Sequence, residues 1–465
     1  MPRTEPARGM RDFLPEDVRR REYVIDVITR VYERYGFEPL ETPAVENLEA
    51  LLGKYGDEGS KLIFKILKRG EHEKTGEADL ALRYDLTVPL ARVMAQHQAK
   101  LPRLFRRYQI QPVWRADRPA RGRFREFYQC DVDLLGSTAP VVEAELCAAV
   151  SDVLTELGFS DFVIRINDRR VLTALLGAAG VAAELHGAAL VALDKLDKIG
   201  AEGVVGELAA RGIGHQAVQG LIRLFDASRE PLPSASVQKA ALEGLHHAGP
   251  AAADELARLE VEVRDDAGRA AVDNLRQIVR LLDGTRAASK IRVDPSLARG
   301  LSYYTGTIME VAVADLAGSL GGGGRYDNLI GMFSGQDIPA CGFSLGLERI
   351  LVVMTERGMF PSTLAMSPAD VMVAMFDVSA AANALRVADH LRVCGLRVLV
   401  YPDADKLGKQ IKYADGRGIP FVALLGDDEM KAGTVTVKDL AAKTQHTYEQ
   451  SAAGAAILEA LKQRG

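Results

Sequence analysis

The chain has 465 residues, a net charge of -5 at pH 7, 48% hydrophobic residues and 26% charged residues. A chain of this length is predicted to hold more than one domain, because single hydrophobic cores stop growing at roughly 250–300 residues. It contains no apolar run long enough to cross a bilayer and no apolar signal core, so a cytoplasmic protein is expected. The four cysteines show no CxxC spacing, which argues against disulfides and a cysteine-bound zinc.

The first predicted element is a helix over residues 15–35, where apolar and aromatic side chains recur at helical spacing. Pro15 lies near its start and Gly36 at its end. The extended, proline-punctuated segment FEPLETPAVEN follows. The segment ALRYDLTVPLARVMA is then predicted to begin as a strand, which would place Asp85 and Thr87 on one face.

The next segment, residues 103–133, is the most informative stretch of the sequence. Up to Arg125 it holds eight arginines and a single acid, Asp117. Two alternating runs, 107–115 and 123–133, flank the turn-rich sequence ADRPARG and predict an antiparallel hairpin. Planar arginine side chains match phosphate oxygens two at a time, so this charge in a mildly acidic protein predicts a polyanion site.

The second run of this hairpin carries a chemical gradient. Strand side chains alternate between faces, so one face is shared by Arg125, Phe127, Gln129, Asp131 and Asp133. Along this face the side chains change from a guanidinium cation to an aromatic ring, then to an amide and finally to two carboxylates. Such a face favours a ligand with a phosphate at one end and an amine or another donor at the other. A solvated basic hairpin is the alternative interpretation, but the acidic end and the interposed ring favour a binding site.

The remaining pattern predicts an insertion and a second α/β module. After a helix over residues 140–157 and the strand DFVIRIND, residues 171–285 are rich in Ala, Leu and Gly and helical in pattern. Strands are expected again in IRVDPSLARGLSYYTGTIMEVAV, followed by the glycine loop GSLGGGGRYDNL and a strand that leads into a helix in ACGFSLGLERILVVMTERG. From residue 368, four strands separated by helices predict a small α/β domain.

Glycines and arginines in the later segments are candidate ligand contacts. The run 321–324 is neither a Walker A loop, since no Lys-Ser/Thr follows, nor a Rossmann turn, since no GxGxxG opens a helix there. Four glycines instead allow backbone to approach a ligand or a neighbouring strand closely. Arg115, Arg299 and Arg349 come from distant segments, and together they would suit a triphosphate and its charged transition state. Singly, none of these arginines is specific: one beside a glycine, such as Arg299, is usually in a surface turn, and Arg349 is explained by a helix-surface salt bridge with Glu348.

These segments resemble the sequence motifs of class II aminoacyl-tRNA synthetases. The hairpin is similar to motif 2, GFSLGLERI to motif 3, and the first helix with EPLETPAVE to motif 1, which builds the dimer interface in that class. LARGLSYYTG and GGGGRYDNL resemble the two signature peptides of the histidyl-tRNA synthetases, and LRYDLTVPLAR resembles their amino-acid-binding strand. The C-terminal module looks like the family's anticodon-binding domain.

The resemblance implies an α/β multidomain protein, with a class II antiparallel-sheet catalytic domain, a helical insertion and a C-terminal α/β anticodon-binding domain. The implied boundaries are 1–170 and 286–362 for the two parts of the catalytic domain, 171–285 for the insertion and 368–465 for the anticodon-binding domain. The implied protein is a homodimer that binds L-histidine, ATP and tRNA(His), with Mg²⁺ arriving with ATP, no tightly bound cofactor and no membrane partner. The implied reaction ligates histidine to tRNA through a histidyl-adenylate.

The resemblance also implies roles for individual residues. Arg115 and Arg299 would be catalytic, approaching the α-phosphate from two sides. The residues implied in ATP binding are Arg115, Asp117, Arg123, Phe127 and Arg349, with Phe127 and Arg349 around the adenine. The residues implied in histidine binding are Asp85, Thr87, Gln129, Asp133, Tyr303 and Tyr304, with Asp133 and Tyr304 at the imidazole. None is assigned to a separate metal site. The sequence departs from the family pattern at Ser302, usually aspartate, and at Asp133, often glutamate in bacteria.

Two readings other than a ligase follow from the same resemblance. One is a non-catalytic histidine-binding paralogue, such as the regulatory subunit of ATP phosphoribosyltransferase. Such paralogues lack the anticodon module and commonly lose catalytic arginines, whereas this chain keeps both. The other is a tRNA-sensing module, which would need an attached effector domain for which 465 residues leave no room.

Overall fold

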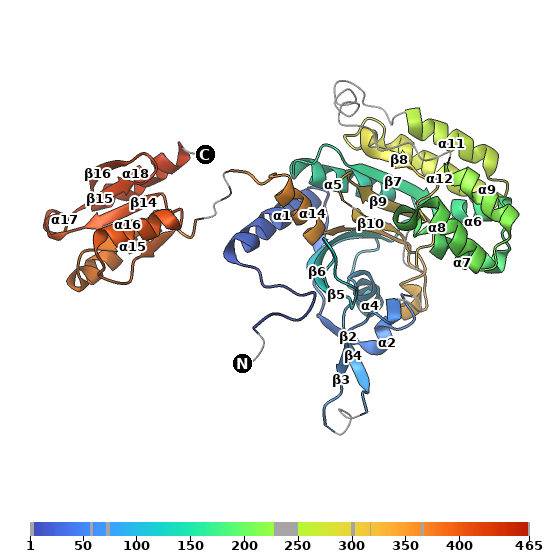
Figure 1. Cartoon of the computed structure of the whole chain (residues 1–465), viewed down its shortest axis with the longest axis horizontal. Helices are drawn as coiled ribbons and strands as arrows, with labels where there is room; N and C mark the ends of the chain where they lie inside the picture. Colours follow the sequence, from blue (N-terminus) through green and yellow to red (C-terminus); the bar gives the residue numbers. More distant parts are fainter. Residues whose placement is uncertain are drawn as a thin grey trace. The chain divides into compact units, whose positions relative to one another are not determined.

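The computed structural model describes residues 4–55, 59–70, 75–226, 250–298, 303–316, 318–362, 364 and 367–463. The chain divides into two compact units. The larger consists of the residues up to Phe13 together with Arg20–Met359, and the smaller of Leu14–Arg19 together with the residues from Phe360 onward. Within the described residues, a sheet of eight strands forms the centre of the larger unit, and a sheet of five strands that of the smaller (Figure 1).

The sheet of the larger unit is antiparallel except at its two edges. Its strands, in spatial order, are β1 (Glu38–Pro39), β5 (Phe105–Trp114), β6 (Glu126–Leu135), β11 (Ala340–Gly346), β10 (Ser319–Arg325), β9 (Thr307–Ala312), β7 (Val163–Asp168) and β8 (Ile291–Val293). The edge strands β1 and β8 pair in parallel with β5 and β7, and the other neighbours pair antiparallel. The predicted antiparallel sheet and the predicted β5–β6 hairpin are both confirmed.

The hairpin presents an apolar face to helices and a polar face to the opposite side. The packed helices include α5 (Val141–Glu156) and α14 (Leu347–Glu356), and α1 (Pro15–Arg34) contacts β6 through Tyr32; all three lie close to where sequence periodicity predicts them. On β6, Cys130, Val132 and Leu134 alternate with the polar side chains of the strand and are buried. The Tyr32 hydroxyl of α1 donates to the carbonyl oxygen of Cys130 over 3.5 Å. Because side chains alternate along a strand, Gln129 lies on the other face.

The glycine run is a strand, not the loop expected from the sequence. Gly321–Gly324 lie within β10, between β9 and β11. A Cβ on Gly323 would overlap the carbonyl oxygen of Gly342, and one on Gly321 would overlap that of Ser344. Glycine therefore allows unusually close backbone approach at the centre of the sheet, as its missing side chain suggests.

The segment around Asp85 also differs from the expected strand. Strand β4 (Ala78–Leu82) ends before Asp85, and helix α4 (Thr87–His97) begins two residues after it. The Asp85 carboxylate accepts a hydrogen bond from the Val88 amide over 3.1 Å, which satisfies one of the amide groups left open at a helix start. Strand β4 instead joins a small sheet with β2 (Val45–Asn47) and β3 (Lys65–Leu67).

The described part of residues 171–285 is helical, as predicted. Its elements are α6 (Arg169–Ala178), η2 (Ala183–Leu185), α7 (His186–Leu193), α8 (Leu196–Ala210), α9 (His215–Asp226), α11 (Pro250–Glu262) and α12 (Asp266–Leu282). Helix α12 buries Ala271, Leu275 and Ile278 at helical spacing and packs on α5 and α6. The boundaries of this insertion stay a prediction, because the larger unit includes both these helices and the sheet.

The smaller unit has the predicted α/β organisation. Its sheet runs in the order β13 (Val398–Val400), β12 (Val371–Met375), β14 (Phe421–Leu425), β15 (Thr434–Asp439) and β16 (Thr444–Glu449). Helices α15 (Ala381–Val393) and α18 (Gln450–Lys462) contribute to one core, and α16 (Leu407–Gly416) to another. Strand β16 escaped prediction because its sequence TQHTYE is polar and mostly exposed.

The remaining short elements are α2 (Leu48–Leu51), η3 (Ala288–Lys290), α13 (Gly331–Ser334), η4 (Val378–Ala380) and α17 (Asp427–Ala432). Over the described parts of both units, none of the helices combines the length and the apolar character that a membrane span requires.

Candidate active site

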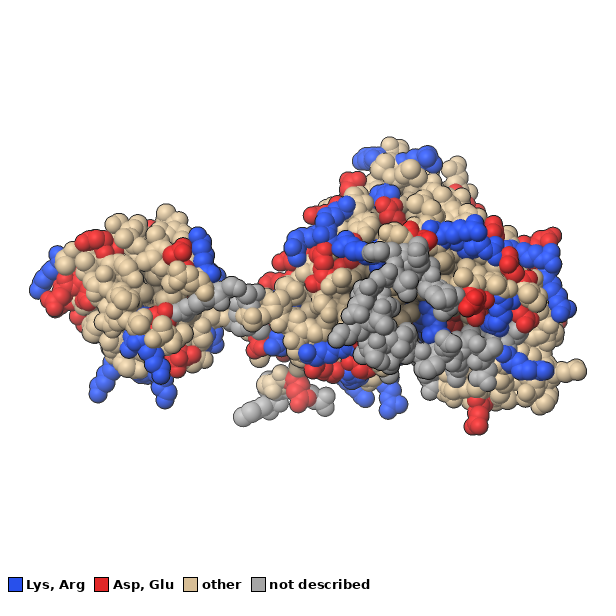
Figure 2. Space-filling model, turned by 90° about the horizontal axis from the view of Figure 1, so that it is seen from above, with Lys and Arg blue, Asp and Glu red and all other residues tan. Residues whose placement is uncertain are grey.

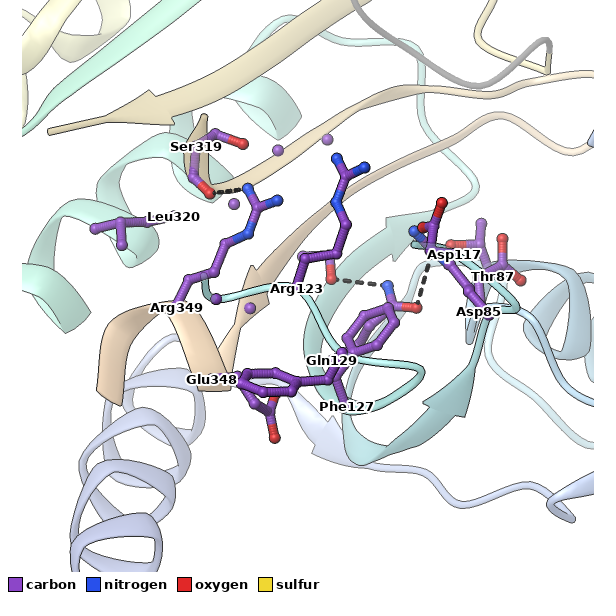
Figure 3. Close-up of a pocket in the computed structure, with 18 of the residues that line it drawn as sticks. Asp85, Thr87, Asp117, Arg123, Phe127, Gln129, Ser319, Leu320, Glu348 and Arg349 are labelled. Carbon is purple, nitrogen blue, oxygen red and sulfur yellow. Dashed lines mark hydrogen bonds between the residues drawn. The ribbon is translucent and has the colours of Figure 1, made fainter. Parts of the chain in front are cut away.

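A cavity of about 360 Å³ lies against strands β6, β10 and β11 of the larger unit (Figure 3). Most of the site residues implied by the sequence line it. They are Asp85, Thr87, Arg115, Asp117, Arg123, Phe127, Gln129, Tyr303, Tyr304 and Arg349. Three residues of the glycine strand, Gly321–Gly323, also line the wall. Segments that are far apart in the sequence therefore meet in one cavity.

Of the implied site residues, one is not described by the structure and one is described but does not line the cavity. Arg299, like Ser302, lies outside the described residues, so its catalytic role stays a prediction. Asp133 is 2% exposed and lies deeper along the β6 face. Its carboxylate pairs with Arg107 at 2.8 Å and accepts a hydrogen bond from the Tyr326 hydroxyl. Its contact with a substrate imidazole also stays a prediction.

Asp85 is the centre of an acidic end of the cavity. Its carboxylate is buried and accepts hydrogen bonds from the hydroxyls of Tyr55 at 2.9 Å and Tyr303 at 3.3 Å. Burial raises the pKa of Asp85, against the opposing effects of the Val88 amide and the Arg115 guanidinium. A cation bound here would regain the charge stabilisation that burial removes. The arrangement therefore suits an ammonium group.

Gln129 connects this end to the rest of the cavity. Its amide nitrogen donates to Asp131 Oδ1 over 3.2 Å and to Ser344 Oγ over 2.9 Å. Its carbonyl oxygen Oε1 accepts from Arg115 Nη2 over 3.4 Å. The amide nitrogen carries two hydrogens, and both have an acceptor in the protein. The carbonyl oxygen has two lone pairs, so besides Arg115 it can accept a hydrogen bond from a ligand.

Arg115 lies between the acidic end and the ring of Phe127. Its Nε donates to the carbonyl oxygen of Tyr84 over 3.0 Å. Its guanidinium carbon lies 4.4 Å from the centroid of the Tyr84 ring and 5.1 Å from that of Phe127. Contacts with two rings and a carbonyl fix the orientation of the guanidinium group. From this position it can contact an anion at the junction of two ligand halves.

The Arg349 side chain is oriented by a contact with strand β10 and not by its sequence neighbour Glu348. The predicted alternative, a salt bridge between Glu348 and Arg349, is wrong: Glu348 Oε1 pairs with Arg21 at 2.8 Å, and Oε2 accepts from the Tyr128 amide at 2.9 Å. Consecutive residues of a helix face different directions. Arg349 instead donates to the carbonyl oxygen of Ser319, and its guanidinium extends in the same direction as that of Arg123 (Figure 3).

The N-terminal segment holds the loop of the hairpin, residues 115–125. The Arg125 amide donates to the carbonyl oxygen of Gly9 over 2.8 Å. The Arg11 guanidinium lies 3.3 Å from the ring centroid of Phe124, a cavity-lining residue. Within the loop, Arg125 Nε donates to the carbonyl oxygen of Asp117 over 3.0 Å. No sequence pattern indicated this contact, because it joins two segments without regular structure.

A buried charge cluster behind the cavity was also not predicted. Arg107 is fully buried, and its Nη2 lies 2.8 Å from Asp133 Oδ2 and 3.7 Å from Asp131 Oδ2. Burial raises the pKa of Asp131 to about 7; Arg107 opposes that shift and Asp133 adds to it. The alternation of β5 and β6 could have indicated the pair, because Arg107 and Asp133 are register partners. For Tyr55, which donates to Asp85, no pattern in the sequence indicated a role in the site.

Comparison with known proteins gives matches over the whole chain. The family model "Histidyl-tRNA synthetase" matches residues 9–350, and "Anticodon binding domain" matches residues 370–460. A histidine–tRNA ligase of Gloeobacter violaceus is 40% identical over 480 residues, covering 98% of each chain. One of Christiangramia forsetii is 39% identical over 461 residues, covering 95% of this chain and 96% of the relative.

Solved structures agree with these matches. A crystal structure of histidyl-tRNA synthetase from Nostoc sp. PCC 7120 covers all of both chains, with a TM-score of 0.79 and 30% identity. A structure of an ATP phosphoribosyltransferase regulatory subunit/histidyl-tRNA synthetase from Bacillus halodurans has a TM-score of 0.69 and 22% identity, covering 88% of this chain and 96% of its own, and shows the shared fold alone. The family match over most of the chain and the identity across its full length lead to one conclusion: the chain belongs to the histidyl-tRNA synthetase family.

Proposed function

We propose that this protein is a histidine–tRNA ligase, which activates L-histidine with ATP and transfers the histidyl group to tRNA(His). One observation carries the proposal. A single cavity joins an acidic end at Asp85 and Gln129 to a cationic and aromatic end at Phe127 and Arg349, with Arg115 between them. The curated relatives that match along the full length of the chain are histidine–tRNA ligases.

In the first step, a carboxylate oxygen of histidine attacks the α-phosphorus of ATP, and pyrophosphate leaves. Arg115 would neutralise the charge that builds between the carboxylate and the phosphate, because it lies where the two substrates would meet. Asp85 and Gln129 would hold the α-ammonium, with Thr87 beside them. The cavity then accelerates the step by positioning and electrostatics, without a side-chain nucleophile.

The nucleotide would occupy the cationic and aromatic end. Phe127 and Arg349 would contact the two faces of the adenine, since a guanidinium and a phenyl ring both stack on planar bases. The contact of Arg349 with the Ser319 carbonyl supports this role, because it fixes the guanidinium in the cavity wall. Arg123, which lines the same wall, would bind the outer phosphates.

Mg²⁺ would accompany the triphosphate. Within the described residues, no cluster of three or more His, Cys, Asp or Glu side chains is arranged as a metal cage. Glu348 has one oxygen on Arg21 and the other on the Tyr128 amide, so it does not fit as a ligand. Asp117, a carboxylate of the cavity wall, fits a site completed by phosphate oxygens. Magnesium bound there would neutralise charge on the leaving pyrophosphate.

The smaller unit would bind the anticodon of the tRNA. The anticodon-domain match covers it, and helix α16 exposes Lys409, Lys412 and, just past its end, Arg417. These cations would contact the RNA backbone. Figure 2 shows acidic and basic side chains interspersed over the visible face, so local clusters of this kind are better candidates than that face as a whole. We further propose a cytoplasmic homodimer built on α1, by analogy with motif 1.

The regulatory-subunit alternative has less support. The chain is similar to ligases at 39–40% identity over nearly its whole length. It retains the anticodon-domain match, and Arg115 lies in the cavity wall. The structure that names a regulatory subunit is 22% identical, which supports a common fold only.

Amino-acid-dependent exchange of labelled pyrophosphate into ATP tests the proposal. Histidine should support exchange, and other amino acids should not. Arg115→Ala should abolish exchange, while Arg280→Ala, an exposed change on α12, should leave it unchanged. Absence of histidine-dependent exchange in folded protein, or exchange with a different amino acid, would contradict it.

A further inference from the structure

The amide of Gln129 is held in one of its two possible orientations. An amide side chain can rotate by half a turn, which exchanges its oxygen and its nitrogen in space. Here the nitrogen donates to Asp131 Oδ1 at 3.2 Å and to Ser344 Oγ at 2.9 Å. The oxygen accordingly faces Arg115 Nη2, at 3.4 Å.

Asp131 is the charged partner in this arrangement. It is 2% exposed and lies two residues along β6 from Gln129, on the same face of the strand. Its register partner on the neighbouring strand β11 is Ser344, so the two acceptors of the Gln129 amide lie side by side. The other carboxylate oxygen, Oδ2, lies 3.7 Å from Arg107 Nη2. Asp131 does not line the cavity, although Gln129 does.

We propose that Asp131 is a positioning residue, which fixes the Gln129 amide with its oxygen toward the cavity and so makes Gln129 an acceptor for the α-ammonium of the substrate. The inference rests on the proposed function, and it adds a residue that does not itself touch histidine. The reverse orientation would place the amide oxygen against the Asp131 carboxylate. It would also turn two amide hydrogens toward the Arg115 cation and the incoming ammonium.

Burial strengthens the preference of the Gln129 amide for this orientation. Hydrogen bonds to charged groups are stronger than neutral ones, and they strengthen further where water is excluded. Arg107 keeps a positive charge beside Asp131 and so opposes the effect of burial, which raises the pKa of this carboxyl group. Ser344 alone could not exclude the reverse orientation, because a hydroxyl can donate as well as accept.

A residue swap tests the proposal. Asp131→Asn removes the charge that fixes the amide, and Gln129→Glu places a second carboxylate 3.2 Å from Asp131. Each single change should raise the KM for histidine in pyrophosphate exchange about tenfold, the effect of losing one charge-assisted hydrogen bond. The KM for ATP should stay within about twofold, since neither changed residue would contact the adenine, which Phe127 and Arg349 would hold.

The Gln129→Glu/Asp131→Asn double variant is the decisive protein. It preserves the total charge, and the new asparagine amide can donate to the new carboxylate, so the repulsion between two buried carboxylates is removed while an oxygen still faces the cavity. Its KM for histidine should return to within about threefold of wild type, a coupling that independent sites do not show. Asp152→Asn is the matched control, because Asp152 is buried on α5 and bonded to Tyr35 and Arg286, away from the cavity.

The outcomes separate this inference from the proposed function. If wild-type protein shows no histidine-dependent exchange, the proposed function fails. If wild type is active but the double variant is as impaired as the two single changes combined, the positioning role of Asp131 is overturned. Equal rises in the KM for ATP and for histidine would also overturn it. Thermal unfolding of wild type, the two single variants and the double variant should show native-like transitions. Ser344→Ala, which keeps Asp131, should raise the KM for histidine less than Asp131→Asn does.

Discussion

Arg21 of helix α1 and Glu348 of helix α14 form a salt bridge of 2.8 Å, although 327 residues separate them in sequence. Their side chains are 9% and 3% exposed. The second oxygen of Glu348 accepts the Tyr128 amide of β6. One carboxylate thus joins two helices to the hairpin, immediately before the cavity residue Arg349. The pair fixes the relative position of the three segments that resemble motifs 1, 2 and 3.

Arg21→Ala should destabilise the larger unit by about 3 kcal/mol or more, because it leaves the Glu348 carboxylate buried without its partner. Urea unfolding followed through Trp114 measures this, since Trp114 is the single tryptophan of the chain and lies on β5. Arg30→Ala, an exposed change on the same helix, should alter stability by no more than about 0.5 kcal/mol. Equal losses in the two variants would contradict the structural role of the pair.

Asp131 should give the protein a stability that falls as pH rises. Burial raises its folded pKa to about 7 from an ordinary value of 3.8. The contribution is fully present below pH ~4 and is lost as pH rises through about 7, because the unfolded chain releases the proton more readily. Arg107, Asp133, Asp85 and Ser344 also act on this carboxyl group, and all remain in the Asp131→Asn variant.

Urea unfolding at several pH values between 5 and 8, without ligands, checks this prediction. The stability of Asp131→Asn relative to wild type should increase with pH over that range. A difference that is constant with pH would show that Asp131 titrates normally.

Gly323→Ala should destabilise the sheet by at least ~2 kcal/mol, because the new methyl group would overlap the backbone of β11. Gly206→Ala is the matched control. Gly206 lies exposed within α8, and an added Cβ meets no atom within 4 Å. That change should be neutral or stabilise by up to ~1 kcal/mol, as alanine favours helix. Retained stability in Gly323→Ala would show that β10 and β11 are spaced more widely than the structure has them.

Arg11→Ala should weaken ATP binding without affecting histidine. The guanidinium of Arg11 packs on Phe124 of the hairpin loop, and a contact of this kind contributes about 0.5–1 kcal/mol. The KM for ATP should therefore rise about two- to fivefold. Arg8→Ala, which alters an exposed residue of the same segment, should leave both KM values unchanged. An equal rise in the KM for histidine would show that the segment acts on the whole cavity.

Regular local patterns predicted much of the fold. The alternation on either side of ADRPARG is a local property, and it correctly indicated the β5–β6 hairpin and the shared face of Gln129 and Asp131. The segment around Asp85 was misjudged because its apolar, β-branched residues fit a strand. The competing effect is the hydrogen bond that the Val88 amide donates to the Asp85 carboxylate at the start of α4.

Contacts between distant residues were beyond sequence patterns. Tyr55 and Tyr303 reach Asp85 from 30 and 218 residues away. Glu348 pairs with Arg21 and not with its neighbour Arg349 because of helix geometry and burial. A local sequence pattern does not show which distant residue will lie beside a buried carboxylate. The cavity residues named by position in the family motifs nevertheless meet, apart from the buried Asp133 and from Arg299 outside the described residues.

The most direct test of the central claim is ATP-dependent charging of a tRNA(His) transcript with labelled histidine. Wild-type protein should charge this transcript and not one of another specificity, and Arg115→Ala should charge neither. Folded wild-type protein that fails to charge tRNA(His), or Arg115→Ala that charges it at the wild-type rate, would contradict the account.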